Sequence, residues 1–185
     1  MTQSTAAPKL EPPVSDRDHA QGSAQAGLTL VEYGDYECPH CARAHPIVRA
    51  VQQRLGKRLR FVFRNFPLST AHPHAAAAAE AAEGAAAQGK FWEMHDLLFE
   101  NQHALEPEEL LAYASRLGLD AKRLGAELAS GAHRPRVQED FMSGVRSGVN
   151  GTPTFFINGR RFDGSWDEEG LLDALENARD EPPAG

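Results

Sequence analysis

The sequence predicts an α/β domain in which a β-α-β unit and a β-β-α unit are separated by a block of helices. Short apolar runs rich in β-branched and aromatic residues occur at positions 28–33, 59–64 and 154–157, as expected for buried strands. Between the last two runs, apolar residues recur at helical spacing. The two cysteines of the chain lie in Cys38-Pro39-His40-Cys41, shortly after the first predicted strand.

Composition and charge limit the classes of function. A chain of 185 residues suits one domain with a substantial core, and a hydrophobic content of 41% is ordinary for a globular protein. The formal net charge of -7 argues against binding to nucleic acid or to an anionic membrane surface. No apolar run approaches the ~20 residues that span a bilayer, so we expect no membrane-spanning segment.

The ends of the chain differ in composition from the rest. Residues 1–26 are rich in Ala, Pro, Ser, Asp and Gln, and no basic stretch leads into an apolar run there as in a Sec signal. We therefore expect a flexible tail at 1–26, one domain at 27–179 and a short tail at 180–185. The expected location is the cytoplasm, with the periplasm or another extracytoplasmic compartment as the alternative.

The first unit is predicted as strand, helix and strand. The run at 28–33 ends at Gly34, and a helix is expected from Pro39 to about Gly56. The second strand follows at 59–64. The apolar face of the helix consists of Ala44, Ile47, Val48, Val51 and Leu55, which recur at three- and four-residue spacing.

Residues 65–147 are expected to form a helical insertion. The Ala-rich stretch at 74–88 is helical by propensity but needs packing partners, because such a helix is marginal in isolation. Pro107 and Asp120 suit the starts of two further helices. The apolar positions of the remaining helices are Phe91, Met94 and Leu98, then Leu110, Leu111, Ala114 and Leu117, then Leu124 and Leu128, and finally Val137, Phe141 and Val145.

The last unit begins with the strand at 154–157. Asn158-Gly159 between this strand and the run at 160–162 is a strong signal for a hairpin. Ser165 and Glu168 fit a capping box for a final helix that carries Leu171, Leu172 and Leu175.

The cysteine pair favours redox chemistry. Cα atoms three residues apart in a helical turn lie roughly 5 Å from each other, within the range that a disulfide tolerates. Pro39 suits the first helical position, which would place Cys38 at the positive end of the helix dipole, with His40 as a further donor. Half of a zinc site or an inert pair is the alternative. His45 could add a third ligand, but a structural zinc site takes four, so we predict no metal site.

Several stretches support a resemblance to a known family. Cys38-Pro39-His40-Cys41 after the first strand and Gly151-Thr152-Pro153-Thr154 before the hairpin resemble the thioredoxin fold, and the helical insertion is similar to that of the bacterial DsbA family. The resemblance covers about residues 26–178. Its further motifs are Tyr33-Gly34-Asp35-Tyr36-Glu37-Cys38, Arg64-Asn65-Phe66-Pro67-Leu68, Gly89-Lys90-Phe91-Trp92 and Thr154-Phe155-Phe156-Ile157-Asn158-Gly159.

The resemblance implies a thiol–disulfide oxidoreductase. Cys38 matches the exposed nucleophile and Cys41 the buried resolving thiol, while Pro39 and His40 match the dipeptide that tunes the redox couple. Pro153 matches the cis-proline, and Thr152 the substrate-binding residue before it. The implied partners are protein or peptide thiols and disulfides and an unidentified redox partner. We expect no cofactor beyond the Cys38–Cys41 disulfide. We also expect the protein to be a monomer. A non-catalytic redox sensor or metal-binding module is the alternative.

The charges around the motif leave the direction of electron flow open. Asp35 and Glu37 flank the cysteines, and their negative charge is expected to raise the pKa of Cys38 and to make the couple less oxidising. Glu32, in an otherwise apolar strand, is expected to face outward rather than to lie buried as a proton relay. The other histidines, among them His72, His74 and His95, are expected at the surface or in packing.

Overall fold

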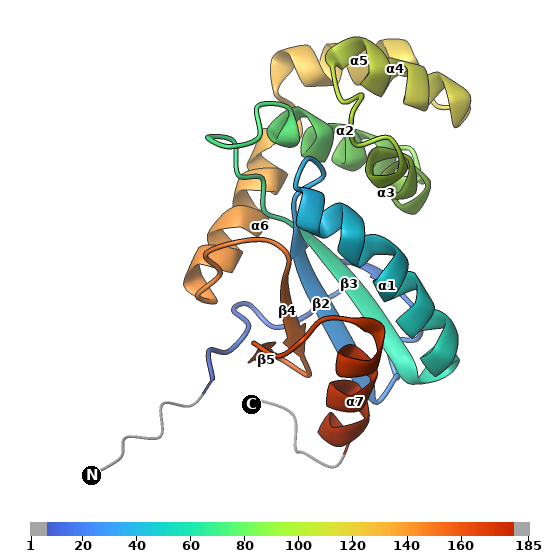
Figure 1. Cartoon of the computed structure of the whole chain (residues 1–185). Helices are drawn as coiled ribbons and strands as arrows, with labels where there is room; N and C mark the ends of the chain where they lie inside the picture. The colour runs from blue at the N-terminus through green and yellow to red at the C-terminus, as the bar shows by residue number, and fades with distance from the viewer. Residues whose placement is uncertain (1–6, 180–185) are drawn as a thin grey trace.

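A computed structural model of the chain describes residues 7–179, and Figure 1 shows their arrangement. The described residues include a five-stranded sheet in the order β1-β3-β2-β4-β5. Its two central strands, β2 and β3, are parallel, and each remaining pair of neighbours is antiparallel. The strand bounds are His19–Gln21 for β1, Leu28–Gly34 for β2, Leu59–Asn65 for β3, Thr154–Ile157 for β4 and Arg160–Phe162 for β5.

Helices α1 (Pro39–Leu55) and α7 (Glu168–Ala178) cover one face of the sheet. Since side chains alternate along a strand, Leu28 and Leu30 of β2 share this face and belong to the core cluster that also contains residues of α1 and α7. Val31 and Tyr33 point to the opposite face and belong to a second, smaller cluster. The predicted strands and these two helices are therefore confirmed, and the α/β class with them.

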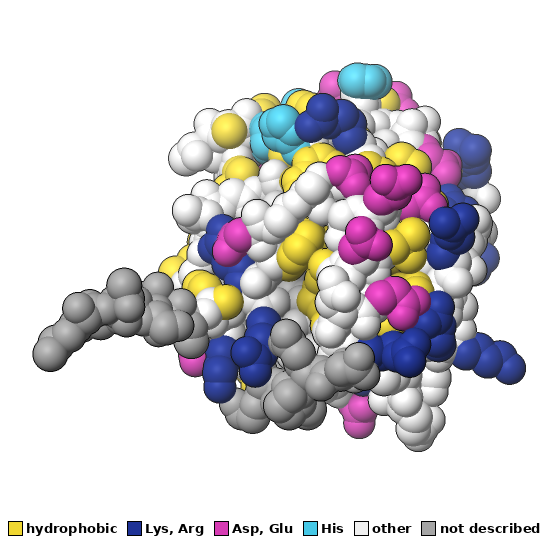
Figure 2. Space-filling view, turned by 60° about the horizontal axis from the view of Figure 1, so that its bottom comes forward, with side chains coloured by type: hydrophobic (Ala, Val, Ile, Leu, Met, Phe, Trp, Pro, Cys, Tyr) yellow, Lys and Arg dark blue, Asp and Glu magenta, His cyan; other side chains and the backbone are white. Residues whose placement is uncertain are grey.

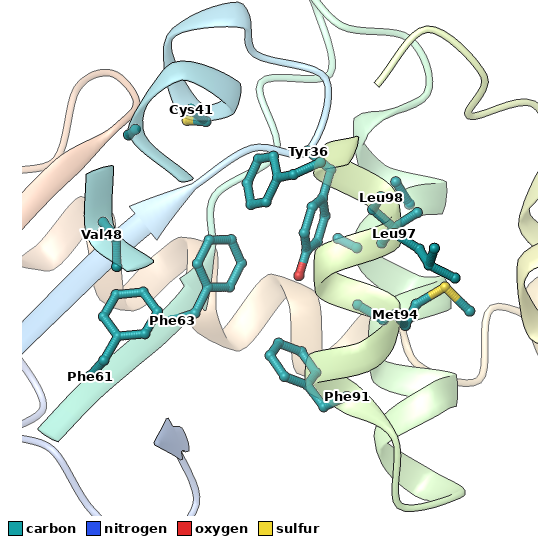
Figure 3. Packing of buried hydrophobic residues seen from close by; sticks show 14 of the residues in the cluster. Tyr36, Cys41, Val48, Phe61, Phe63, Phe91, Met94, Leu97 and Leu98 are labelled. Atoms are coloured by element: carbon teal, nitrogen blue, oxygen red, sulfur yellow. The ribbon is translucent and has the colours of Figure 1, made fainter. Parts of the chain in front are cut away.

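Five helices lie between β3 and β4. The first, α2, consists largely of alanines that are buried, which lets neighbouring helices pack closely against it. Phe63 of β3 packs near Phe91 of α3 at a ring-centroid distance of 6.4 Å (Figure 3), so the insertion and the sheet share one core. The helix bounds are Ala75–Ala87 for α2, Phe91–Glu100 for α3, Pro107–Arg116 for α4, Ala121–Ser130 for α5 and Arg134–Arg146 for α6.

The hairpin forms where the sequence places it, but the cap of α7 differs from the prediction. Asn158 and Gly159 have φ angles of 47° and 80°, the left-handed conformation that this tight turn needs. Asp167, rather than Ser165, caps α7, and its carboxylate accepts a hydrogen bond of 2.8 Å from the Gly170 N–H. Ser165 instead donates its hydroxyl to Asp167. The expected capping box is thus wrong because the helix begins two residues later.

The segment predicted as a flexible tail is part of the fold from residue 7 onward. β1 pairs with β3, and Leu10 is buried. Arg64 of β3 is 2% exposed and donates to the carboxylate of Asp18 at 2.8 and 3.0 Å and to the carbonyl oxygens of Pro12 and Pro13. A buried guanidinium needs hydrogen-bond partners of this kind. The segment that supplies them has no apolar periodicity from which an ordered structure could have been predicted. Residues 1–6 and the predicted tail at 180–185 lie outside the described residues.

None of the described helices combines the length and the apolar composition needed to cross a membrane. Figure 2 shows one face of the molecule, on which acidic and basic side chains are interspersed with apolar ones. The charge on this face is therefore mixed in sign.

Candidate active site

The cysteine motif lies where β2 leads into α1. Cys38 is the N-cap residue of α1, with φ and ψ of -74° and 121°, and Pro39 occupies the start of the helix as predicted. Cys41 follows within the first turn and is fully buried. Cys38 is also buried, with 4% of its surface exposed, which corrects the exposed position expected for it. Both side chains are free thiols, so the structure describes the reduced form.

The loop before β4 lies against Cys38, although it is distant in sequence. The peptide bond between Thr152 and Pro153 is cis. The thiol of Cys38 donates to the carbonyl oxygen of Thr152 at a Sγ–O distance of 3.6 Å. Oγ1 of Thr152 is buried without a hydrogen-bond partner in the reduced form described. The structure thus brings together Cys38 and Thr152, two residues that the sequence assigns to one site.

The two sulfurs have opposite electrostatic environments. The pKa of Cys38 falls to about 5, chiefly because the Cys41 thiol donates to its thiolate. Burial opposes this fall, while Thr152 and the backbone N–H groups of the first turn of α1 support it. The pKa of Cys41 is raised well above its usual value by burial, and then by Cys38 and the nearby Glu32. Cys38 is therefore the thiolate of the pair at neutral pH.

Glu32 is buried, which contradicts the outward orientation expected from the sequence. Its side chain belongs to the face of β2 that carries Leu28 and Leu30, under α1, because side chains alternate along the strand and Val31 and Tyr33 occupy the opposite face. Burial, assisted by the charge of Cys38, raises the pKa of Glu32 to about 8. Oε1 has no hydrogen-bond partner in the described structure. A carboxyl group in this state can exchange a proton near neutral pH.

Two histidines compensate the acidic residues that flank the motif. Nδ1 of His72 lies 2.8 Å from Oδ2 of Asp35, and Nδ1 of His74 lies 2.8 Å from Oε1 of Glu37. Partial burial works against the charged form of His72, but Asp35 and the Cys38 thiolate outweigh it and raise its pKa. The hydrogen bond to Glu37 raises the pKa of His74.

The pKa of Cys38 is lowered overall even though Asp35 and Glu37 flank the motif, and neither carboxylate is a leading cause of that shift. Sequence reasoning missed the compensation because the imidazoles come from a loop 37 residues further along the chain. One signal was available. His72 and His74 are two positions apart, as are Asp35 and Glu37, and this matched spacing lets two neighbouring loops pair twice.

Three further residues near the motif, His40, His45 and Tyr36, have neighbours other than those expected. The exposed ring of His40 accepts a hydrogen bond from Arg43 at 2.8 Å, so His40 supports Cys38 through its backbone N–H. His45 packs against His95 in the interface between α1 and α3, away from the thiol pair it was considered to join. Tyr36 is buried, and its hydroxyl pairs with Nδ1 of His95 at 2.9 Å.

The chain matches a family model described as Thioredoxin over residues 15–177. The chain belongs to the thioredoxin family. The oxidised BdbD of Bacillus subtilis superimposes on this thioredoxin domain with a TM-score of 0.84 and 23% identity, over 94% of this chain and 98% of BdbD. A thioredoxin-like oxidoreductase from Silicibacter pomeroyi superimposes with a TM-score of 0.80 and 26% identity, over 91% of this chain and 95% of that protein. The helical insertion of the thioredoxin domain is of the DsbA type, as in Wolbachia pipientis alpha-DsbA2, where the TM-score is 0.73 at 18% identity over 90% and 88%.

A curated relative has a different name. The thioredoxin domain is 49% identical over 163 residues to the protein named Na(+)/H(+) antiporter NhaA 1 of Salinispora arenicola. The match covers 88% of this chain and 25% of that protein. The thioredoxin domain thus spans about a quarter of the length of this relative.

Proposed function

We propose that the chain is a thiol–disulfide oxidoreductase that exchanges disulfides with protein or peptide substrates. The observation that carries the proposal is the contrast between the two sulfurs, one helical turn apart. Cys38 has a pKa lowered to about 5, while burial raises the pKa of Cys41. This contrast suits Cys38 as nucleophile and leaving group and Cys41 as the resolving thiol.

The exchange runs through a mixed disulfide. In the oxidising direction, a substrate thiolate attacks Sγ of Cys38, the Cys38–Cys41 bond breaks, and Cys41 leaves as a thiolate that takes up a proton. A second substrate thiolate attacks the substrate sulfur of the mixed disulfide and releases Cys38 as a thiolate. The substrate loses two electrons and gains a disulfide, and the cysteine pair gains both electrons. The reducing direction reverses each step.

Glu32 and Thr152 have complementary parts in this cycle. Glu32, whose pKa is raised to about 8, supplies the proton that Cys41 takes up and accepts it again when Cys41 attacks the mixed disulfide. The unpartnered hydroxyl of Thr152 is a donor for the Cys38 thiolate, while its carbonyl oxygen accepts from the Cys38 thiol. Thr152 and Pro153 form the loop against which a substrate segment binds.

The favoured direction is oxidation of substrates. A pKa of about 5 at Cys38, below the reference value of 9.0, stabilises the reduced folded form at neutral pH, where the thiolate is present. Stabilising the reduced form makes the disulfide a stronger oxidant. A reducing compartment would instead hold the pair largely reduced, so the compartment decides how often this direction is used.

The experiment combines a redox titration with cysteine variants. Equilibration in glutathione buffers, followed by thiol alkylation, gives the reduction potential, and oxidation of a reduced peptide with two thiols gives turnover. Cys38→Ser is expected to abolish turnover. Cys41→Ser is expected to accumulate mixed disulfides that dithiothreitol releases. A wild-type disulfide that forms reversibly without turnover would overturn the proposal and favour a redox sensor.

The curated relative favours a second candidate for the substrate. A quarter of a protein named as a sodium/proton antiporter matches this chain at 49% identity. We propose that such an antiporter carries the cysteines on which Cys38 acts. The test is to trap mixed disulfides with Cys41→Ser in native membranes and to identify the partner by mass spectrometry. Recovery of an antiporter with Cys41→Ser, but not with a variant lacking both cysteines, supports the candidate, and recovery of other proteins alone overturns it.

A further inference from the structure

A group of potential metal ligands lies between α1 and α3, outside the thiol site. His45 of α1 and His95 and Asp96 of α3 each offer one ligand atom, and these atoms all lie within 4.8 Å of one another. Two imidazoles and a carboxylate are ligands that Zn²⁺ and related divalent ions accept in protein sites. The spacing is therefore compatible with one ion bound by all three side chains.

His45 has an unused ligand atom directed into this group. The residue is 9% exposed, and its Nε2 is buried without a hydrogen-bond partner in the described structure. Nε2 lies 3.3 Å from Oδ1 of Asp96, close enough for electrostatic attraction but without the geometry of a hydrogen bond. Its ring is fixed by stacking on Phe99 at a centroid distance of 5.0 Å. A buried polar atom normally has a hydrogen-bond partner, and Nε2 of His45 has only the ion-pair contact with Asp96.

His95 of α3 is buried, and a hydrogen bond to a neighbouring side chain fixes the orientation of its ring. Its Nδ1 pairs with the hydroxyl of Tyr36 at 2.9 Å, which leaves Nε2 for an ion. When a histidine binds a metal through one ring nitrogen, a hydrogen bond to the other commonly orients the ring. Tyr36 is in place for that role.

Asp96 supplies negative charge and access from solvent. Its side chain is 38% exposed. The three residues line a cavity of about 330 Å³, which provides room for water ligands beside the ion.

We propose that His45, His95 and Asp96 bind a divalent transition-metal ion of the Zn²⁺ class, with water completing its coordination. The ion takes the contact that Nε2 of His45 lacks and joins α1, the helix that carries the cysteines, to α3 of the insertion. Arg49 competes with the ion for the carboxylate of Asp96, because Nη1 of Arg49 lies 3.9 Å from Oδ2 of Asp96. It also lies 3.7 Å from Oε1 of Glu100, which can hold the guanidinium when the ion binds.

The test measures zinc binding with the thiols removed from competition. The parent is the full chain with Cys38→Ser and Cys41→Ser, and the oxidised wild-type chain is a second background in which the disulfide occupies both sulfurs. Calorimetric titration with ZnCl₂ is expected to give one saturable site in both. Cobalt titration is expected to give visible d–d absorption from nitrogen and oxygen ligands, and bound Zn²⁺ is expected to raise Tm.

Matched variants separate the proposed site from adventitious histidines. Asp96→Asn keeps the shape of a partly exposed side chain and is expected to weaken zinc binding at least tenfold, as is His45→Gln. Arg49→Gln is expected to strengthen it. His133→Gln, which removes a histidine paired with Glu127 on the insertion, is the control and leaves the affinity unchanged. No saturable binding in either background, or equal affinity in the parent and Asp96→Asn, overturns the proposal.

Discussion

Nδ1 of His72 lies 2.8 Å from Oδ2 of Asp35, and Asp35 precedes Cys38 by three residues. The Asp35 side chain is fully buried and also accepts hydrogen bonds from the backbone N–H groups of Glu37 and Leu68, both at 2.8 Å. This carboxylate therefore holds the cysteine loop and the loop after β3 together. The pKa of the neighbouring His72 is raised, which favours a positive charge that offsets the negative charge of Asp35 near Cys38.

Replacing His72 tests that compensation. In His72→Gln, the buried Asp35 loses its cationic partner, so we expect the pKa of Cys38 to rise and the rate of its alkylation near pH 5 to fall roughly tenfold. Thiolate absorbance at 240 nm as a function of pH measures the pKa directly. His74→Gln is the matched comparison and is expected to have a smaller effect, because Glu37 and His74 are more exposed. Equal titration curves for wild type and His72→Gln would contradict the argument.

Glu32 is expected to make stability fall as pH rises. Its folded-state pKa of about 8 lies above the reference value of 4.5, so the folded chain holds this proton more tightly than the unfolded chain. That stabilising contribution is complete below pH 4.5 and is lost as pH rises through 8. Glu32→Gln removes the dependence, and reduced Glu32→Gln should exceed reduced wild type in stability by roughly 2–4 kcal/mol above pH 8.

Urea unfolding of both reduced proteins at a series of pH values between 5 and 9 checks the expectation for Glu32, with the difference between them as the readout. A difference that does not grow with pH would show that Glu32 titrates normally. The same variant should slow the attack of Cys41 on a mixed disulfide, since the proton acceptor is missing, without preventing the first alkylation of Cys38.

The hydroxyl of Tyr36 is expected to contribute to stability through His95. Tyr36→Phe removes the partner of a buried imidazole nitrogen at 2.9 Å, so we expect a loss of about 1–3 kcal/mol in the free energy of unfolding. Tyr113→Phe is the control: its hydroxyl donates to the carbonyl oxygen of Ala104 at the edge of the insertion, where water can replace it. Denaturant unfolding of both variants measures the difference, and a larger loss at Tyr113 would contradict the expectation.

The segment before β2 is expected to be required for full stability. Removal of residues 1–26 takes away every hydrogen-bond partner that Arg64 has in the described structure except Tyr33, as well as strand β1, and should lower Tm markedly. Removal of residues 1–6 alone keeps β1 and these partners, so it is the control and should lower Tm less. Asp18→Asn removes only the negative charge. It is expected to lower the free energy of unfolding by about 3–5 kcal/mol at neutral pH, because it leaves the buried Arg64 without its ion-pair partner.

The pH dependence gives Asp18→Asn a second readout. Burial would raise the pKa of Asp18, but Arg64 outweighs it and lowers the value below 3.8. The carboxylate therefore stabilises the fold above pH 3.8, and this contribution is lost as pH falls through the lowered pKa. The stability difference between wild type and Asp18→Asn should shrink in strong acid, and a constant difference would indicate a cause other than charge.

Local patterns were sufficient for most of the secondary structure. The strand at 28–34, the helix that begins at Pro39 and the Asn158-Gly159 turn each depend on contacts within a few residues, such as alternation, a proline at the first helical position or a left-handed turn. The helix that follows Ser165 was predicted with the wrong cap because Ser165 and Asp167 are both good caps, and only packing decides which residue begins the helix.

The sequence by itself determined the β-α-β and β-β-α order and the helical insertion, and it predicted redox chemistry for Cys38 and Cys41. Only the tertiary structure decided the electrostatics around them. The orientation of Glu32 depends on which face α1 covers, and the compensation of Asp35 depends on a histidine 37 residues away. The contact between His45 and Asp96 joins two helices. Charge interactions act through space and desolvation, so they cannot be read from the order of residues along a chain.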